Sequence, residues 1–317
     1  METIFGAIFC VAMIAVVIIT SRLKKKSIQK IYEQFQEKDF AYTLVFRSNE
    51  WGPSTEKIIL NTGKITESFS DEKLDAANFN VSVKSEILDD GSDTPVEKEK
   101  NVPVKRAFLC DIDGNEIIKS EEDSSSEIPD DETSSATHIA LEIENSPGDA
   151  FSSPFIYDSE QKHNRWKKIY DFKIGHNLFE KEMSECSDWF SPAAQKFRPL
   201  KNSGEQNAFF YIPENVGAKE KSAHPLMVLS LGEKSRTDIP MTVLENYLTP
   251  LVDDKIQTSL GGLFVLCMKS ESEKILSRFI KKNRAINRDK ITMIDISEGD
   301  EKLREWIKNQ NEKNQEN

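Results

Sequence analysis

The sequence contains little histidine and little cysteine, and this scarcity argues against several kinds of site. There are four of each in 317 residues. No two cysteines form a C-x-x-C pair and no histidine stands close to a cysteine, so the spacing typical of structural zinc is missing. Cys10 lies in an apolar run and the other three cysteines are scattered, which does not suggest a disulfide framework. We expect a reducing compartment, no metal and no cofactor.

Positive charge is also in short supply. The chain has 42 Lys and Arg against 54 Asp and Glu, a formal net charge of -12. Such a surface repels a phosphate backbone on average, so we do not expect nucleic acid as a partner. Hydrophobic residues make up 38% of the chain and include 18 Phe, enough for a substantial core. The length suits two modest domains or one large domain.

A long apolar run occurs at the N-terminus. From Thr3 to Thr20 every residue is apolar, small or Thr. As a helix these residues would span about 27 Å, close to the hydrocarbon core of a thin bilayer. A cleaved signal peptide is the alternative, but Met1 and Glu2 offer no positive side chain and no A-x-A-like site follows. We therefore predict a single transmembrane anchor over residues 1–20.

The segment after this run indicates an orientation. It carries five cationic residues and no acid up to residue 30, and these would lie at the membrane surface: Arg22, Lys24, Lys25, Lys26 and Lys30. The positive-inside rule then places the C-terminal part in the cytosol. A short span suits the endoplasmic reticulum or the mitochondrial outer membrane. Apolar residues at helical spacing from Ile28 to Phe35 predict a basic juxtamembrane amphipathic helix over residues 21–38.

Residues 39–175 have the pattern of a β-rich module. Aromatic and β-branched residues predict strands over residues 40–46, 57–60, 78–87, 102–112, 138–143 and 166–174, with a polar loop over 89–101. Between Asp111 and Glu132 there are ten acidic residues and one Lys. Such a stretch cannot bury enough apolar surface to fold, so we predict a disordered insertion over about 119–136.

Residues 176–310 predict an α/β module. The segment 178–190 has helical spacing, and apolar strands at 226–231, 263–268 and 291–296 then alternate with helical patterns at 242–252, 271–285 and 300–308. Strands that are apolar on both faces are typical of a parallel sheet covered by helices on two sides. The predicted fold is therefore α+β and α/β, with a parallel sheet of three or more strands and a polar tail over 311–317.

One short motif suggests chemistry in the β-rich part. The eight residues from Phe108 to Asn115 include Asp111, Asp113 and Gly114 in the order DxDG. They resemble the first motif of the haloacid dehalogenase phosphatases, which implies an aspartate nucleophile at Asp111 and a proton shuttle at Asp113. A β-hairpin that turns at Asp113-Gly114 accounts for the same residues without chemistry.

The ends of the predicted parallel strands are the other places where a ligand is expected. The segment Leu231–Ser235 follows the first strand but contains neither a P-loop nor a G-x-G-x-x-G pattern. Asp238 and Asp295 could meet at this edge and bind a metal, or they could be ordinary loop residues. No Ser stands in G-x-S-x-G, and no His is placed as a base.

The segment His163–Lys168 surrounds Trp166 with basic neighbours. It could stack on an RNA base, or Trp166 could be a core residue of a strand whose outer face is charged.

These patterns identify no catalytic residue. The main interpretation is a single-pass membrane scaffold or adaptor, with the bilayer and an unidentified protein as partners. The alternative is a membrane-tethered α/β enzyme that binds a small ligand at the carboxyl ends of its parallel strands. A deep polar pocket at those ends would favour the enzyme, and an exposed apolar patch would favour the adaptor.

Overall fold

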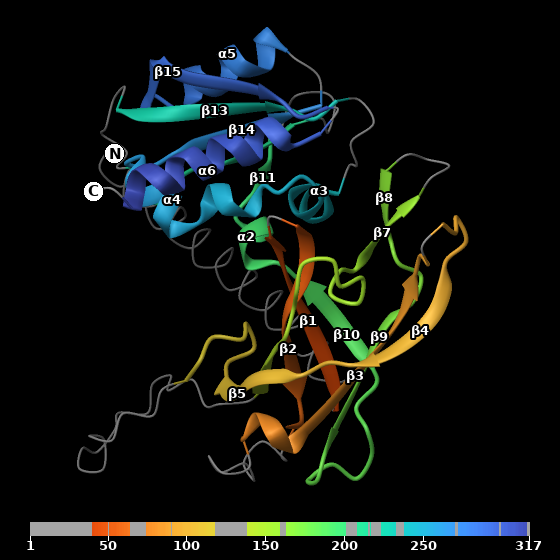
Figure 1. Ribbon diagram of the computed structural model, residues 1–317. Helices are drawn as coiled ribbons and strands as arrows, with labels where there is room; N and C mark the ends of the chain where they lie inside the picture. The colour runs from red at the N-terminus through yellow and green to blue at the C-terminus, as the bar shows by residue number, and fades with distance from the viewer. Residues whose placement is uncertain are drawn as a thin grey trace, which may run out of the picture.

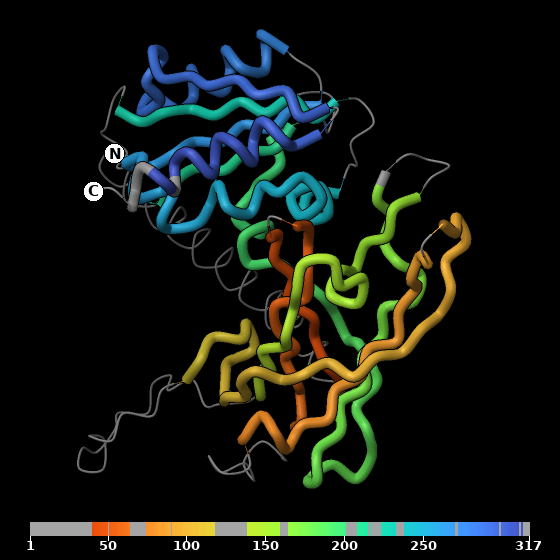
Figure 2. The backbone as a smooth tube through the Cα atoms, viewed as in Figure 1, coloured from red at the N-terminus to blue at the C-terminus, as the bar shows by residue number. Residues whose placement is uncertain are grey.

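The computed structural model describes residues 40–49, 51–63, 74–89, 91–117, 138–158, 163–200, 208–214, 216, 223–232, 238–269, 272–297 and 299–315. Within these ranges the protein is a mixed α+β fold, rich in strands, with several sheets and few helices (Figure 1). A β sandwich forms one half and an α/β module the other. The backbone trace in Figure 2 shows the two halves meeting where the red end of the sandwich reaches the helices of the α/β module.

The sandwich consists of two sheets and a small hairpin. The larger sheet has the order β10-β1-β2-β6-β5 and the smaller one the order β4-β3-β9. All neighbours are antiparallel except β1 and β10, which are parallel. The elements are β1 (Ala41–Asn49), β2 (Gly52–Asn61), η2 (Ala76–Asn78), β3 (Phe79–Ile87), β4 (Val96–Asn101), β5 (Val104–Cys110), β6 (His138–Ile143), β7 (Phe155–Asp158), β8 (His163–Trp166), β9 (Tyr170–His176) and β10 (Cys186–Phe190). Strands β7 and β8 form the hairpin.

The core of the sandwich lies between its two sheets. Alternate side chains of β1, including Tyr42 and Phe46, meet side chains of β3 and β9, including Val83 and Phe172. The Tyr42 hydroxyl accepts a hydrogen bond from the Phe172 backbone N–H at 2.9 Å, so this buried polar group has a partner. The alternation is the period of two that a half-buried strand requires.

The α/β module is built on a second five-stranded sheet, with the order β11-β12-β14-β13-β15. Strands β13, β14 and β15 are parallel, and β12 is antiparallel to β14. The elements are α2 (Pro192–Gln195), β11 (Arg198–Pro199), β12 (Ala208–Tyr211), β13 (His224–Ser230), α3 (Ile239–Glu245), η3 (Thr249–Val252), α4 (Asp254–Ser259), β14 (Phe264–Met268), α5 (Glu273–Lys282), β15 (Ile286–Asp295) and α6 (Glu301–Gln315).

Helices cover both faces of this sheet. Helices α3, α4 and α6 pack on one face and α5 packs on the other through Phe279 (Figure 1). The three predicted parallel strands lie between two helical layers, and their burial on both faces explains their continuous apolar runs. The sheet as a whole is mixed, because the antiparallel strands β12 and β11 extend it.

Several predicted elements differ from the structure. Part of the helix predicted over 178–190 is strand β10, which pairs with the edge of β1. The predicted loop over 89–101 contains β4. The residues of β4 are all exposed, so no alternation of apolar and polar residues indicates a strand there. Helix α6 continues to Gln315, through the first residues of the predicted polar tail.

The prediction of a single-pass membrane protein is corrected. Among the described residues, no helix is long and apolar enough to cross a membrane. The longest helix there, α6, has 15 residues and many charges, whereas a span takes about 20 mostly apolar residues. The predicted anchor, the amphipathic helix, the basic cluster of Arg22, Lys24, Lys25, Lys26 and Lys30, and the acidic insertion all lie outside the described residues. The assignment to a cytosolic face of the endoplasmic reticulum or mitochondrial outer membrane is withdrawn with the anchor.

Candidate functional site

The carboxyl ends of β13 and β15 bring Gly232 and Ser297 together. The two strands are parallel neighbours in which Ser230 is aligned with Asp295, so the residues that follow them leave the sheet side by side. Gly232 has φ 76°, and a Cβ added to it would lie 2.8 Å from the Ser297 Cβ and 3.3 Å from its Cα. Real Cβ atoms do not approach each other so closely. Only glycine at position 232 therefore lets the backbone pass directly against Ser297.

Buried neighbours hold both residues of this pair in place. The Leu231 N–H donates to Met268 O at 2.8 Å, and the Ile296 N–H donates to Ser230 O at 2.9 Å. The side chains of Leu231 and Ile296 are buried in the core of the α/β module. Ser297 itself is exposed. The sheet thus presents a reachable hydroxyl on a rigid support.

Asp295 places a negative charge beside this hydroxyl. The Ser297 backbone N–H donates to Asp295 Oδ1 at 3.0 Å. This bond and a further hydrogen bond from the Ser297 side chain lower the pKa of the Asp295 carboxyl below its usual value. The carboxylate is therefore ionised and orients the hydroxyl, but its low pKa makes it a weak proton acceptor.

The first turn of α6 follows Ser297 and is held against Tyr247, which comes shortly after α3. The Arg304 guanidinium makes two hydrogen bonds to the Asp300 carboxylate, at 2.7 and 2.6 Å. It also lies 4.4 Å from the centre of the Tyr247 ring.

The structure does not bring Asp238 and Asp295 into a metal site. Asp238 caps α3, and its Oδ1 accepts a hydrogen bond from the Met241 N–H at 2.9 Å. Asp295 Oδ1 likewise accepts a hydrogen bond from the Ser297 N–H. Within the described ranges, no group of three or more His, Cys, Asp or Glu side chains could hold a metal ion. Both carboxylates are explained by local turns.

The DxDG segment is a β-hairpin turn. Asp111 Oδ1 accepts hydrogen bonds from the backbone N–H groups of Asp113 and Asn115, at 3.0 and 2.8 Å, and Oδ2 accepts from Asn115 Nδ2 at 2.9 Å. Gly114 has φ 78° and packs its backbone against Ile59. The hairpin interpretation is confirmed. The resemblance to the phosphatases ends with these residues, because β5 is an antiparallel edge strand.

Trp166 is a core residue of the sandwich. Its ring lies 5.4 Å from Phe46, 5.4 Å from Phe155 and 5.0 Å from Trp189, measured between centroids. The neighbouring Arg165 forms an ion pair with Glu86 at 2.9 Å. The interpretation as a core anchor is confirmed. The ring packs against protein side chains and is not available to stack on an RNA base.

No histidine accompanies Ser297. All four histidines of the chain lie in described strands. His138, His163 and His176 belong to the sandwich, and His224 lies at the amino end of β13, the opposite end of the strand from Gly232. His224 Nδ1 is 2.6 Å from Gly261 O. A Ser-His pair at this edge is therefore absent from the described part of the chain.

Ser297 is not recognisable from the sequence because its surroundings depart from the usual nucleophile pattern. Asp295 stands where the first glycine of G-x-S-x-G would be, and Gly299 keeps the last position. Positive φ outside glycine occurs among the described residues at Phe40 and Tyr247, so Ser297 lacks the strained backbone of a nucleophile elbow. The remaining signal was a Ser-x-Gly directly after an apolar strand, together with Leu-Gly after the first strand.

No family model and no curated protein matches the chain. Among solved structures, the chain is similar to the crystal structure of a thermostable esterase. The two are 15% identical with a TM-score of 0.53, and the match covers 82% of this chain and 71% of that one. At this identity the likeness establishes a shared fold across both halves of the protein.

Proposed function

We propose that the α/β module is an enzyme unit that binds a small ligand at the carboxyl ends of β13 and β15, where Ser297 contacts the ligand. The observation that carries this proposal is the close approach of Gly232 to an exposed Ser297. Open α/β sheets bind ligands at this edge. The fold shared with an esterase structure adds support at the level of fold alone. We found no feature of the described residues that favours the scaffold interpretation.

A small carboxylic ester is the ligand class that this arrangement fits best. Ser297 Oγ would attack the ester carbonyl carbon, the ester C–O bond would break, and the alcohol would leave with a proton. Water would then hydrolyse the acyl-serine and release the acid. The bare backbone at Gly232 lies directly beside Ser297, and this closeness is the structural reason for placing the ester carbonyl there.

The proton of Ser297 needs an acceptor. No histidine lies at this edge in the described residues, and the lowered pKa of Asp295 makes that carboxylate a poor base. Water or hydroxide is then the acceptor. We therefore expect slow turnover whose rate rises steadily with pH, without the plateau that an imidazole base produces.

The test uses the full chain with p-nitrophenyl acetate and p-nitrophenyl butyrate. Ser297→Ala should reduce turnover to the uncatalysed rate, and a fluorophosphonate probe should label the wild-type protein at Ser297. Ser92→Ala, which changes an exposed serine in the sandwich, is the matched control and should behave as wild type. Equal turnover in wild type and Ser297→Ala, with no label on Ser297, would rule out the proposal.

A further inference from the structure

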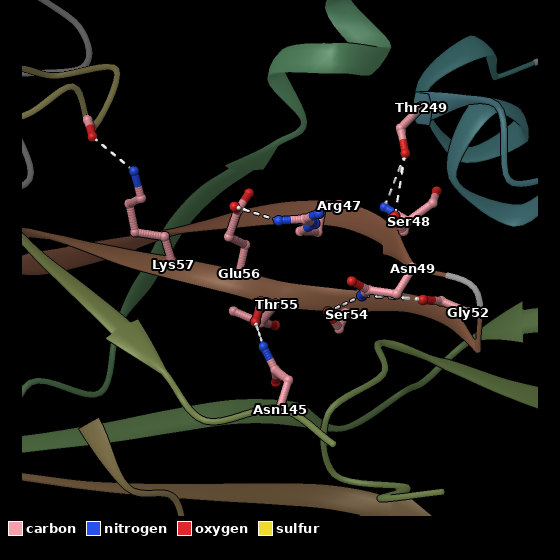
Figure 3. Close-up of polar contacts among 11 residues, drawn as sticks. Arg47, Ser48, Asn49, Gly52, Ser54, Thr55, Glu56, Lys57, Asn145 and Thr249 are labelled. Atoms are coloured by element: carbon pink, nitrogen blue, oxygen red, sulfur yellow. Dashed lines mark hydrogen bonds and ion pairs between the residues drawn. The ribbon is translucent and has the colours of Figure 1, made fainter. Parts of the chain in front are cut away.

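We infer that the β sandwich positions this site, through Ser48 at the end of β1 and Thr249 at the start of η3. The inference rests on the proposed function, since it assigns the sandwich a role at the same site. The Ser48 N–H donates to Thr249 Oγ1 at 3.3 Å (Figure 3). Ser48 Oγ also donates to Leu244 O at 2.9 Å. Ser48 and Thr249 are both buried, so these hydrogen bonds are shielded from water.

Helix α3 belongs to the cores of both halves. The Leu244 side chain is buried within the sandwich core, and Met241 packs against the same core. The neighbouring Val243 is buried in the core of the α/β module instead. A helix with two buried faces cannot shift against one half without disturbing its packing with the other.

The carboxyl end of α3 is connected to the Ser297 side of the proposed site. The amino end of this helix is capped by Asp238. Its carboxyl end leads to Tyr247, which lies under the Arg304 guanidinium. Arg304 in turn is bound to Asp300, close to Ser297 in the chain. The position of α3 therefore bears on the Ser297 side of the site through the stacked arginine.

Ser48 thus acts as a positioning residue, because it touches neither Gly232 nor Ser297 but holds helix α3, which is connected to the Ser297 side of the site. Removing its hydroxyl leaves the Leu244 carbonyl buried without this partner. We expect α3 to open more often, and the local exchange of its backbone amides to report that opening.

The experiment is hydrogen exchange with mass spectrometry on the full chain. In Ser48→Ala and Thr249→Val, exchange should be faster by roughly fivefold over residues 239–249, as the loss of one buried hydrogen bond implies. Thr249→Ser keeps the hydroxyl and should restore slow exchange. Thr43→Val is the control, because its hydroxyl bonds to Ser187 within the sandwich at 3.1 Å. It should leave residues 239–249 unchanged.

Two results would overturn the inference. One is unchanged exchange over residues 239–249 in Ser48→Ala. The other is an equal increase across β3, β9 and β14, which would mean a general loss of stability.

Where the wild type turns over an ester, Ser48→Ala should raise KM more than it lowers kcat, and Thr249→Ser should reverse this. A wild type that neither turns over ester nor labels at Ser297 defeats the proposed function, and the exchange pattern still decides whether Ser48 positions α3.

Discussion

Gly232 lies so close to Ser297 that a methyl group on its α-carbon would come within 2.8 Å of the serine Cβ. Gly232→Ala should therefore push the end of β13 away from Ser297 and also strain a backbone with φ 76°. We expect a loss of about 2–4 kcal/mol in the free energy of unfolding, from strain and overpacking together, and no fluorophosphonate label on Ser297. Urea unfolding and labelling measure the two effects.

The matched control is Gly91→Ala. Gly91 has φ 78° but a Cβ there would meet nothing within 4 Å, so this variant carries the backbone strain alone. It should cost about 1 kcal/mol and leave labelling unchanged. If the two variants lose equal free energy of unfolding and Ser297 is still labelled in both, the contact between Gly232 and Ser297 is not needed for function.

Asp295→Asn tests the charge next to Ser297. An ionised carboxylate disfavours the negative oxygen that forms when an ester is attacked, whereas an amide keeps an acceptor for the Ser297 N–H and removes the charge. We expect ester turnover to rise by about threefold to tenfold at pH 7, with Ser297→Ala as the background. A fall to that background would instead make Asp295 the proton acceptor.

Lys167 should make stability depend on pH. Its ammonium group is buried and donates to Ser85 Oγ at 2.9 Å, and burial lowers the pKa of Lys167 to about 8. The unfolded chain keeps an ordinary lysine pKa of about 10.4, so between pH 8 and that value it binds more protons than the folded protein. The free energy of unfolding should therefore rise by about 2–3 kcal/mol from pH 7.5 to pH 10.5 through this group.

Lys167→Met provides the comparison, because it lacks the titrating group and all other residues titrate as before. Urea unfolding at several pH values should give a difference between the two proteins that grows in favour of the wild type above pH 8. Parallel curves for the two proteins would show that folding does not lower the pKa of Lys167.

The hairpin at Asp111 allows a test of its structural role. Asp111→Ala removes the acceptor of three hydrogen bonds in the turn and should cost about 1–2 kcal/mol. Asp111→Asn keeps one oxygen for the two backbone N–H groups and should cost less than about 1 kcal/mol. Thermal unfolding measures both. We also expect no magnesium-dependent turnover of p-nitrophenyl phosphate, and turnover that Asp111→Asn removes would restore the phosphatase interpretation.

Several elements were predictable because their signals are local. Strands β13 and β14 are short apolar runs, β1 is rich in aromatic and aliphatic residues, and β3 alternates polar and apolar residues, so burial can be read from neighbouring residues. The DxDG turn was recognisable for the same reason, since its hydrogen bonds join residues at most four apart.

Elements that depend on distant partners were not predictable. Strand β4 carries only exposed side chains and is a strand because its backbone pairs with β3. Strand β10 is formed by pairing with β1, far away in the sequence. In both cases the backbone partner, rather than the side-chain pattern, supplies the stabilising hydrogen bonds.

The sequence by itself determined that an apolar strand ends at Leu-Gly and that another ends at Asp-Ile-Ser. Only the tertiary structure decided that these two ends are neighbours, because the order β14-β13-β15 places β15 directly beside β13. Parallel pairing then aligns Ser230 with Asp295, and the chain leaves both strands at the same edge. Gly232 and Ser297 meet for that reason, since strand order in a sheet follows from the burial of whole strands and is not encoded in any short stretch of residues.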